Sequence, residues 1–201
     1  MLGFQLMLAC CRQEWHSPET VDPRCHPGNA WVNSVTVATS TDGGRRFAHP
    51  ADYKIRSPAP WRKGFFCCSP SCSVQFGSFE PSNIVAKGKY FYALFNYISA
   101  PVTNATARGL IQGTCIMRTA ELGKGSAWKV WTANASWGRE EDCTPIVSED
   151  IKTFSYNTYL RRYMGVGYQG STMGYVLSED LLSWSAFVPF FSVPIPQGAS
   201  S

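Results

Sequence analysis

The sequence predicts an all-β fold: a β-propeller of four-stranded antiparallel blades that is incomplete, with about two and three-quarter blades. Two observations support this prediction. A pattern of strand, polar turn and aromatic return strand occurs three times along the 201 residues. In addition, two stretches each contain four predicted strands in a row, and repeats of this size are typical of propeller blades.

The clearest of the three patterns is the stretch 40–47, Ser-Thr-Asp-Gly-Gly-Arg-Arg-Phe. It follows residues 35–39, whose alternating β-branched side chains predict a strand. Asp42 and the two glycines after it predict a tight turn, because glycine tolerates positive φ and the aspartate can accept hydrogen bonds from backbone amides. Looser versions of the pattern occur at residues 118–128 and 178–184.

The two complete units are predicted from apolar runs that glycine, proline and polar residues separate. The first unit has strands at residues 82–86, 90–97, 114–118 and 128–131. The second has strands at residues 144–148, 158–168, 173–178 and 184–187. Because residues 90–97 are apolar on both faces, we expect this strand to be buried between neighbouring sheets.

The opening segment supplies three strands of a blade, at about residues 4–11, 31–39 and near Arg46, and lacks an innermost strand. Residues 50–79 are expected to be irregular, because four prolines interrupt them. We therefore expect one partial propeller domain over residues 1–201. Its blade units lie at about 4–49, 80–131 and 144–187, followed by a tail at 188–201. Since propellers typically have about four to eight blades, the missing blades are expected to belong to a longer parent chain.

Composition narrows the class of protein. Hydrophobic residues make up 44% and charged residues 16% of the chain, which indicates a globular rather than a disordered protein. The net charge of +4 is small and no Lys/Arg cluster alternates with aromatic residues, so nucleic acid is not expected as a partner. No apolar stretch is long enough for a membrane span. No cofactor is expected.

The cysteines and histidines do not predict a metal site. No Cys-x2-Cys pair has a matching second pair, and the three histidines show no ligand spacing. Eight cysteines are too few for a disulfide scaffold at this length, which leaves half-buried or occasionally paired thiols. The triplets beginning at Asn104 and Asn134 match the glycosylation motif and suggest an extracellular, secreted parent protein, although such triplets are common by chance.

The alternating direction of the strands in each predicted blade indicates which loops meet at one end of the central channel, and so predicts a catalytic site there. In a four-stranded antiparallel blade, the entrance of the first strand and the loop between strands two and three lie on the same face. Three acids fall on that face at the mouth of the central channel: Glu14, Glu80 and Asp142. We predict them as catalytic residues, because glycoside hydrolysis needs paired carboxylates. Asp42 and Asp180 fall on the opposite face and are assigned to turns.

Aromatic and polar side chains are predicted around the same mouth. Binding sites commonly combine aromatic walls with a few placed polar groups, and aromatic faces stack on sugar rings while amides bind hydroxyl groups. The predicted substrate-binding residues are Trp15, His16, Tyr156 and Asn157.

Three motifs carry a resemblance to a known group of proteins. They are Gly-Ser-Phe-Glu-Pro-Ser at 77–82, Cys-Ile-Met-Arg-Thr at 115–119 with a tryptophan at 128, and Ser-x-Asp-Leu-x-x-Trp-Ser at 178–185. Together they resemble the five-bladed propeller glycosidases of the arabinanase, xylosidase and fructosidase group. The stretch 40–47 resembles the Asp-box of sialidase-type propellers, which is a structural turn.

The resemblance implies that three blades each contribute an acid to the channel mouth. Glu80 and Pro81 stand where a fructosidase has Arg-Asp-Pro, and Asp142 and Cys143 stand where it has Glu-Cys. Each is a departure from the group's pattern, because it moves the carboxylate by one methylene. A displacement of about 1 Å can cost about a hundredfold in rate.

These observations predict a glycoside hydrolase-like propeller that acts on or binds a carbohydrate. Two alternatives remain open. A non-catalytic carbohydrate-binding or scaffold propeller would keep the blades without the chemistry. A sialidase-type propeller would need an arginine triad, and Arg118, Arg161 and Arg162 form no obvious triad in the sequence.

Overall fold

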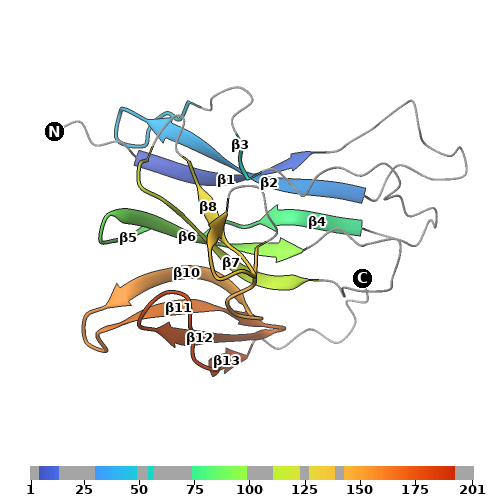
Figure 1. Cartoon of the computed structure of the whole chain (residues 1–201), viewed down its shortest axis with the longest axis vertical. Coiled ribbons are helices and arrows are strands. Elements are labelled where there is room, and N and C mark those ends of the chain that lie inside the picture. Colours follow the sequence, from blue (N-terminus) through green and yellow to red (C-terminus); the bar gives the residue numbers. More distant parts are fainter. Residues whose placement is uncertain are drawn as a thin grey trace, which may run out of the picture.

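A computed structural model describes residues 5–13, 30–48, 54–56, 74–98, 111–122, 127–138 and 143–192. These residues form an all-β structure with mostly antiparallel pairing, and they contain no helix (Figure 1). Among them, therefore, no helix has the length and apolarity that a membrane crossing requires. Two sheets account for the described strands.

The larger sheet has nine strands. Its main order is β1-β2-β4-β6-β7-β8-β9, with β3 beside β2 and β5 beside β6. The strands are β1 (Gln5–Gln13), β2 (Ala30–Ser40), β3 (Lys54–Arg56), β4 (Val74–Phe79), β5 (Val85–Lys87), β6 (Tyr90–Ile98), β7 (Gln112–Thr119), β8 (Lys129–Trp131) and β9 (Trp137–Gly138). All neighbours are antiparallel except β2 and β4, which pair in parallel.

The β2–β4 pairing corrects two expectations. The first and second predicted units belong to one continuous sheet rather than to two separate ones, since β2 hydrogen-bonds to β4. Residues 50–79 are also not irregular throughout, because β3 and β4 lie within them. All four prolines lie outside both strands.

The smaller sheet has four antiparallel strands in chain order: β10 (Asp150–Asn157), β11 (Arg162–Gln169), β12 (Thr172–Ser178) and β13 (Val188–Ser192). The prediction of strands at 144–148 and 184–187 is therefore wrong. Residues 158–161 of the predicted strand 158–168 form a turn between β10 and β11, and the strand predicted near Arg46 is replaced by bends with one isolated bridge at Ala48. The first strand of the smaller sheet starts at Asp150, and residues 144–148 contribute one isolated bridge, at Val147. Residues 184–187 precede β13, where Trp184 Nε1 donates to the carbonyl oxygen of Leu181 in the turn. Ser185 instead bonds to Leu177 of β12: its amide donates to Leu177 O and its hydroxyl accepts from Leu177 N.

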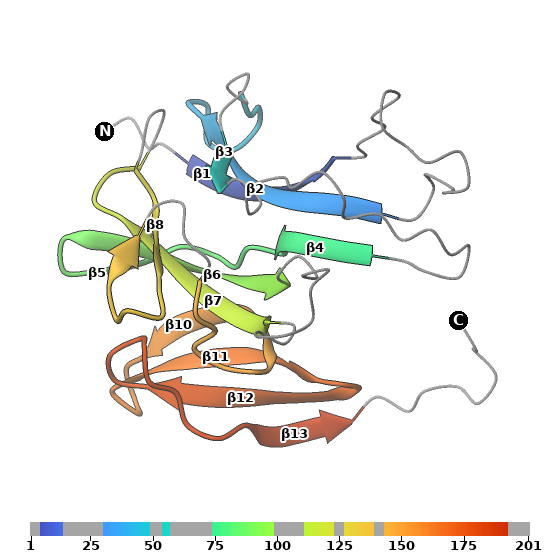
Figure 2. The ribbon, with the colours of Figure 1, turned by 45° about the vertical axis from the view of Figure 1, so that its right-hand side comes forward.

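The β6–β7 hairpin forms the centre of the core, as the apolar character of 90–97 predicts. On one face, Phe95, Cys115 and Met117 pack with Val35 of β2 in one buried cluster. On the other face, Leu94 and Ile116 pack with side chains of the smaller sheet: Ile151, Phe154, Tyr163 and Val176. Figures 1 and 2 show β10 next to the hairpin, so the two sheets meet there.

A disulfide joins Cys115 of β7 to Cys143, with a Cα–Cα distance of 6.1 Å. Both cysteines are buried, and the backbone at Cys143 also bridges to Thr132. The crosslink fixes the segment before β10 against the hairpin.

The close approach of β10 and β11 requires a glycine at position 167. A Cβ built at Gly167 would overlap the backbone carbonyl oxygen of Asp150 and lie 2.7 Å from Ile151 Cα. We expect Gly167→Ala to lower the free energy of unfolding by at least about 2 kcal/mol, since backbone cannot move aside cheaply. Urea unfolding measures this loss. Gly170→Ala is the control: it has open space and costs only about 1 kcal/mol for its positive φ. Equal losses would contradict the packing argument.

The disulfide closes a loop with a sequence separation of 28. In the loop-entropy description such a crosslink stabilises the folded state by about 3–4 kcal/mol. The double variant Cys115→Ala, Cys143→Ala should lose this amount in urea unfolding. A variant as stable as the parent chain would show that this bond does not constrain the unfolded state.

Candidate functional site

Glu80 lies at a break in the strand that runs beside β6. It follows β4 directly, has a φ of 44° and is exposed. Pairing with β6 resumes after the break, where Ser82 N donates to Leu94 O and Leu94 N donates to Ser82 Oγ, both at 2.8 Å. The positive φ turns Glu80 out of the regular strand.

Three polar side chains from two strands gather around Glu80: Asn96, Asp150 and Lys152. Asn96 of β6 donates from Nδ2 to Glu80 Oε2 at 3.3 Å and also to Asp150 Oδ1 of β10. Lys152 of β10 forms ion pairs with Asp150 Oδ2, at 2.6 Å, and with Glu80 Oε2. Because one amide nitrogen contacts both carboxylates, their contacting oxygens lie within about 6 Å of each other. We call these four residues the Glu80 cluster.

Thr114 of β7 hydrogen-bonds to Asn96 and to the backbone of β10, and so orients the Glu80 cluster. Its Oγ1 has two acceptors within hydrogen-bond distance, Asn96 Oδ1 at 2.9 Å and the Glu149 carbonyl oxygen at 2.5 Å, and its single proton can go to either. The amide oxygen of Asn96 faces Thr114 and its nitrogen faces the two acids. Thr114 Oγ1 also accepts from Ile151 N at 3.0 Å. Thr114 is fully buried, so these bonds satisfy a hydroxyl that has no access to water.

The environment of the cluster shifts two of its charges. Burial raises the pKa of Asp150, and the hydrogen bond from Asn96 opposes that rise. The nearby Lys152 ammonium also favours the ionised carboxylate. Burial lowers the pKa of Lys152. Both groups are therefore held in surroundings that penalise charge, which is common at functional sites and also in structural ion pairs.

A cavity of about 210 Å³ adjoins the cluster. Its lining combines apolar side chains with amide, hydroxyl and carboxylate groups: Phe79, Glu80, Asn96, Tyr97, Ile98, Gln112, Gly113, Ser148, Glu149 and Asp150. The volume is below the range of about 300–1,000 Å³ that drug-sized ligands need, so one small polar unit fits best.

The structure describes only some of the predicted site residues. Glu80 lies in the cluster, whereas Glu14, Trp15, His16 and Asp142 lie outside the described residues.

Tyr156 and Asn157 are described, at the end of β10 remote from Asp150. That end is about 20 Å away along the strand. There the Tyr156 ring packs edge-on against Tyr163, and Asn157 Oδ1 accepts from Leu160 N. The structure does not bring these two residues to Glu80.

Asp150, Lys152 and Asn96 are cluster members that the sequence interpretation did not select. Asn96 could have been found from the sequence, because it is the single amide in an otherwise apolar predicted strand. Asp150 and Lys152 could have been found only if β10 had been predicted as a strand. Among the described residues, no group of three or more His, Cys, Asp or Glu side chains could hold a metal ion.

The stretch 40–47 forms the predicted tight turn. Ser40 Oγ donates to Asp42 Oδ1 at 2.8 Å and accepts from Gly44 N at 2.9 Å. Asp42 Oδ1 accepts from the amides of Arg46, at 2.9 Å, and Arg45, at 3.0 Å. The Arg46 amide and the Ser40 hydroxyl hold the pKa of Asp42 below its ordinary value. The Asp42 carboxylate therefore stabilises the turn, as the sequence predicted.

The stretch after β12 forms a similar turn that is one residue shorter. Ser178 Oγ donates to Asp180 Oδ1 at 3.1 Å and accepts from Leu181 N at 2.8 Å. Asp180 Oδ1 accepts from the amides of Ser183, at 2.7 Å, and Leu182, at 2.8 Å. Burial alone would raise the pKa of Asp180, but these two amides and the Ser178 hydroxyl outweigh it and lower the pKa.

Asp180 lies at the opposite end of the hairpin from Glu80. Lys87 Nζ donates to the carbonyl oxygens of Glu179 and Asp180, both at 3.1 Å. Lys87 pairs with Tyr90 at the start of β6. Asn96 is six residues further along β6, about 20 Å away.

Comparisons with known proteins add no family to this picture. The chain matches no protein-family model, and no curated protein matches it at a significant level.

Removal of the shared lysine tests the electrostatics of the cluster. In Lys152→Met the two carboxylates would face each other, and like charges raise the pKa of one of them. A carboxyl with a raised folded pKa contributes most stability below its unfolded pKa of about 3.9 and loses it as pH rises through the folded value. We expect the variant's stability loss to be about 1 kcal/mol greater at pH 7 than at pH 4, since both acids are partly exposed.

Denaturant unfolding at the two pH values measures this difference. Lys89→Met, which removes an exposed lysine from the turn before β6, should show the same small loss at both. A pH-independent loss in Lys152→Met would show that the two acids do not interact.

Proposed function

We propose that this chain is a glycoside hydrolase-like protein that binds a carbohydrate unit in the cavity beside the Glu80 cluster. Glu80 and Asp150 are the paired carboxylates in this proposal. The observation that carries it is that one amide and one ammonium hold these two acids together at the edge of a cavity. An upper limit of about 6 Å between the two carboxylates is compatible with the spacing of about 5–5.5 Å in retaining glycosidases and is shorter than the spacing of about 6.5–9.5 Å in inverting ones.

The two acids differ in environment, which supports different roles. Asp150 is half-buried with a raised pKa, as a proton donor to a leaving oxygen requires. Glu80 is exposed, so its carboxylate can reach the sugar carbon as a nucleophile, whereas Lys152 pairs with both acids and does not distinguish them. In the proposed reaction, Glu80 attacks the sugar carbon while the glycosidic C–O bond breaks and Asp150 protonates the leaving oxygen. Water then hydrolyses the glycosyl–Glu80 bond, with the deprotonated Asp150 accepting a proton from the water, so both carboxyl groups are restored.

The wider architecture belongs to the same proposal. Two observations support this part of the proposal: the four strands of the smaller sheet pair in chain order, and β4, β6, β7 and β8 are successive neighbours within the larger sheet. We propose that these two groups of strands are two blades of an incomplete propeller whose other blades come from a parent chain. Glu14 and Asp142 remain predicted further acids of the channel mouth.

One observation favours a second function, carbohydrate binding without hydrolysis. Lys152 pairs with both carboxylates, so the cluster is held as an ion-paired network. Such a network orients hydrogen-bond acceptors for sugar hydroxyls but does not leave a free acid and base. Binding and turnover must therefore be measured separately.

The experiment uses the full chain with arabino-, xylo- and fructo-oligosaccharides. Glu80→Gln and Asp150→Asn should each reduce turnover at least about a hundredfold, because each removes an acid–base or nucleophilic group. Both variants should retain the thermal unfolding transition. Glu179→Gln, which changes an exposed acid paired with Arg162, is the matched control and should leave turnover unchanged.

The outcomes separate the two functions. Sugar binding without turnover in the parent chain, weakened by both variants, would support the binding function and reject hydrolysis. Neither binding nor turnover with any of the three sugar classes would overturn the proposal as a whole.

A further inference from the structure

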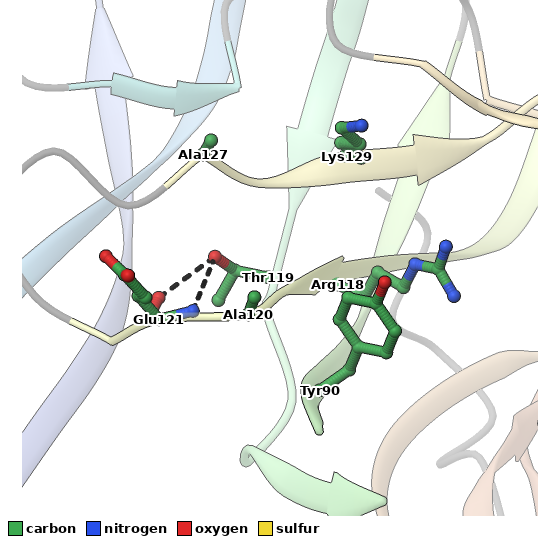
Figure 3. A pocket seen from close by; sticks show the side chains of 7 residues that line it. All are labelled: Tyr90, Arg118, Thr119, Ala120, Glu121, Ala127 and Lys129. Carbon is green, nitrogen blue, oxygen red and sulfur yellow. Dashed lines mark hydrogen bonds between the residues drawn. The ribbon is translucent and has the colours of Figure 1, made fainter. Parts of the chain in front are cut away.

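A second cavity lies at the opposite end of the β6–β7 hairpin from the Glu80 cluster. It has a volume of about 310 Å³ and is lined by Tyr90, Arg118, Thr119, Ala120, Glu121, Ala127 and Lys129 (Figure 3). Tyr90 begins β6 and Thr119 ends β7, whereas the first cavity is lined by the end of β6 and the start of β7. The two cavities are therefore separate.

Arg118 is held rigidly beside this cavity. Its guanidinium carbon lies 4.1 Å from the centre of the Tyr90 ring and 4.0 Å from the centre of the Trp137 ring. Contacts on aromatic faces fix the plane of a guanidinium group and leave its N–H edges free to donate. This arrangement pre-organises Arg118 for a ligand that accepts hydrogen bonds in that plane.

Arg118 lacks an anionic partner within the part of the chain that the structure describes. Its Nε is buried and has no hydrogen-bond partner there. None of the salt bridges among the described residues includes it. Buried polar groups are nearly always satisfied, so an unpaired donor of a charged group points to a bound water or ion.

The lining of this cavity contains two cations, Arg118 and Lys129, and one acid, Glu121. Lys129 of β8 is exposed and sits directly across from Arg118 in the β7–β8 register. Glu121 is the one acid in the lining, and Figure 3 shows its carboxyl group turned away from Arg118. A small anion at this place would meet two cations.

We propose that this cavity binds a small oxyanion, of the carboxylate or phosphate class, between Arg118 and Lys129. The planar guanidinium fork matches the spacing of two oxyanion oxygens, and the ammonium supplies a point charge from the neighbouring strand. The cation–π contacts hold the arginine in place before the ligand arrives. This site is independent of the function proposed for the Glu80 cluster.

Isothermal titration calorimetry on the full chain tests the proposal, with inorganic phosphate and acetate as probes and chloride as reference at constant ionic strength. We expect saturable binding of at least one probe at one site. Lys129→Gln should weaken it about three- to tenfold, because one charged contact is lost at an exposed position. Arg118→Gln should abolish it. Arg162→Gln, which removes a positive charge from the smaller sheet, should leave it unchanged.

The two probes identify the class of ligand, since phosphate and acetate differ in charge and shape. If Arg118→Gln fails to fold, Lys129→Gln decides the question, because its side chain is exposed. Binding that is unaffected by Lys129→Gln would overturn the proposal. So would the absence of saturable binding with both probes.

Discussion

Burial of the β6–β7 hairpin on both faces is the constraint on which the rest of the structure depends. One face packs against β2 through Phe95 and Met117, and the other packs against the smaller sheet through Leu94 and Ile116. Since neither face of the central strands reaches water, polar chemistry on the hairpin is confined to its ends. The Glu80 cavity lies at one end, and the Arg118 cavity lies at the other.

The polar pair Asn96 and Thr114 shows how this constraint also builds the first site. The two residues lie opposite each other in the β6–β7 register. Thr114 is fully buried, so its hydroxyl must be satisfied within the protein. It bonds to Asn96 and to the Ile151 amide, which attaches the start of β10 to the hairpin and places Asp150 beside Glu80. The hydrogen bonds that satisfy the buried Thr114 hydroxyl therefore also position the residues of the Glu80 cluster.

The sequence predicted those parts of the fold that local patterns determine. The tight turn at Asp42 and the double burial of the strand at 90–97 follow from a glycine pair and from a continuous apolar run. β10 was missed because its pairing with β11 shifts register between Ile151 and Thr153. Ile151 and Phe154, its two buried apolar residues, are consequently spaced by three instead of two. Because its strand was not predicted, Asp150 was not selected as a site residue.

The parallel contact between β2 and β4 had no local signal at all. It joins residues about 44 positions apart, such as Asn33 and Gly77, and depends on how the whole sheet is assembled.

The two aspartate turns show the opposite case, in which local side-chain hydrogen bonds override the backbone preference of the residues in the turn. Gly43 and Gly44 supply positive φ in the first turn, whereas the second uses Leu181 at φ 79°. The Ser178 and Asp180 caps fix that backbone, and full burial of the Leu181 side chain offsets its strain. A serine and an aspartate two residues later can therefore hold a tight turn that contains no glycine.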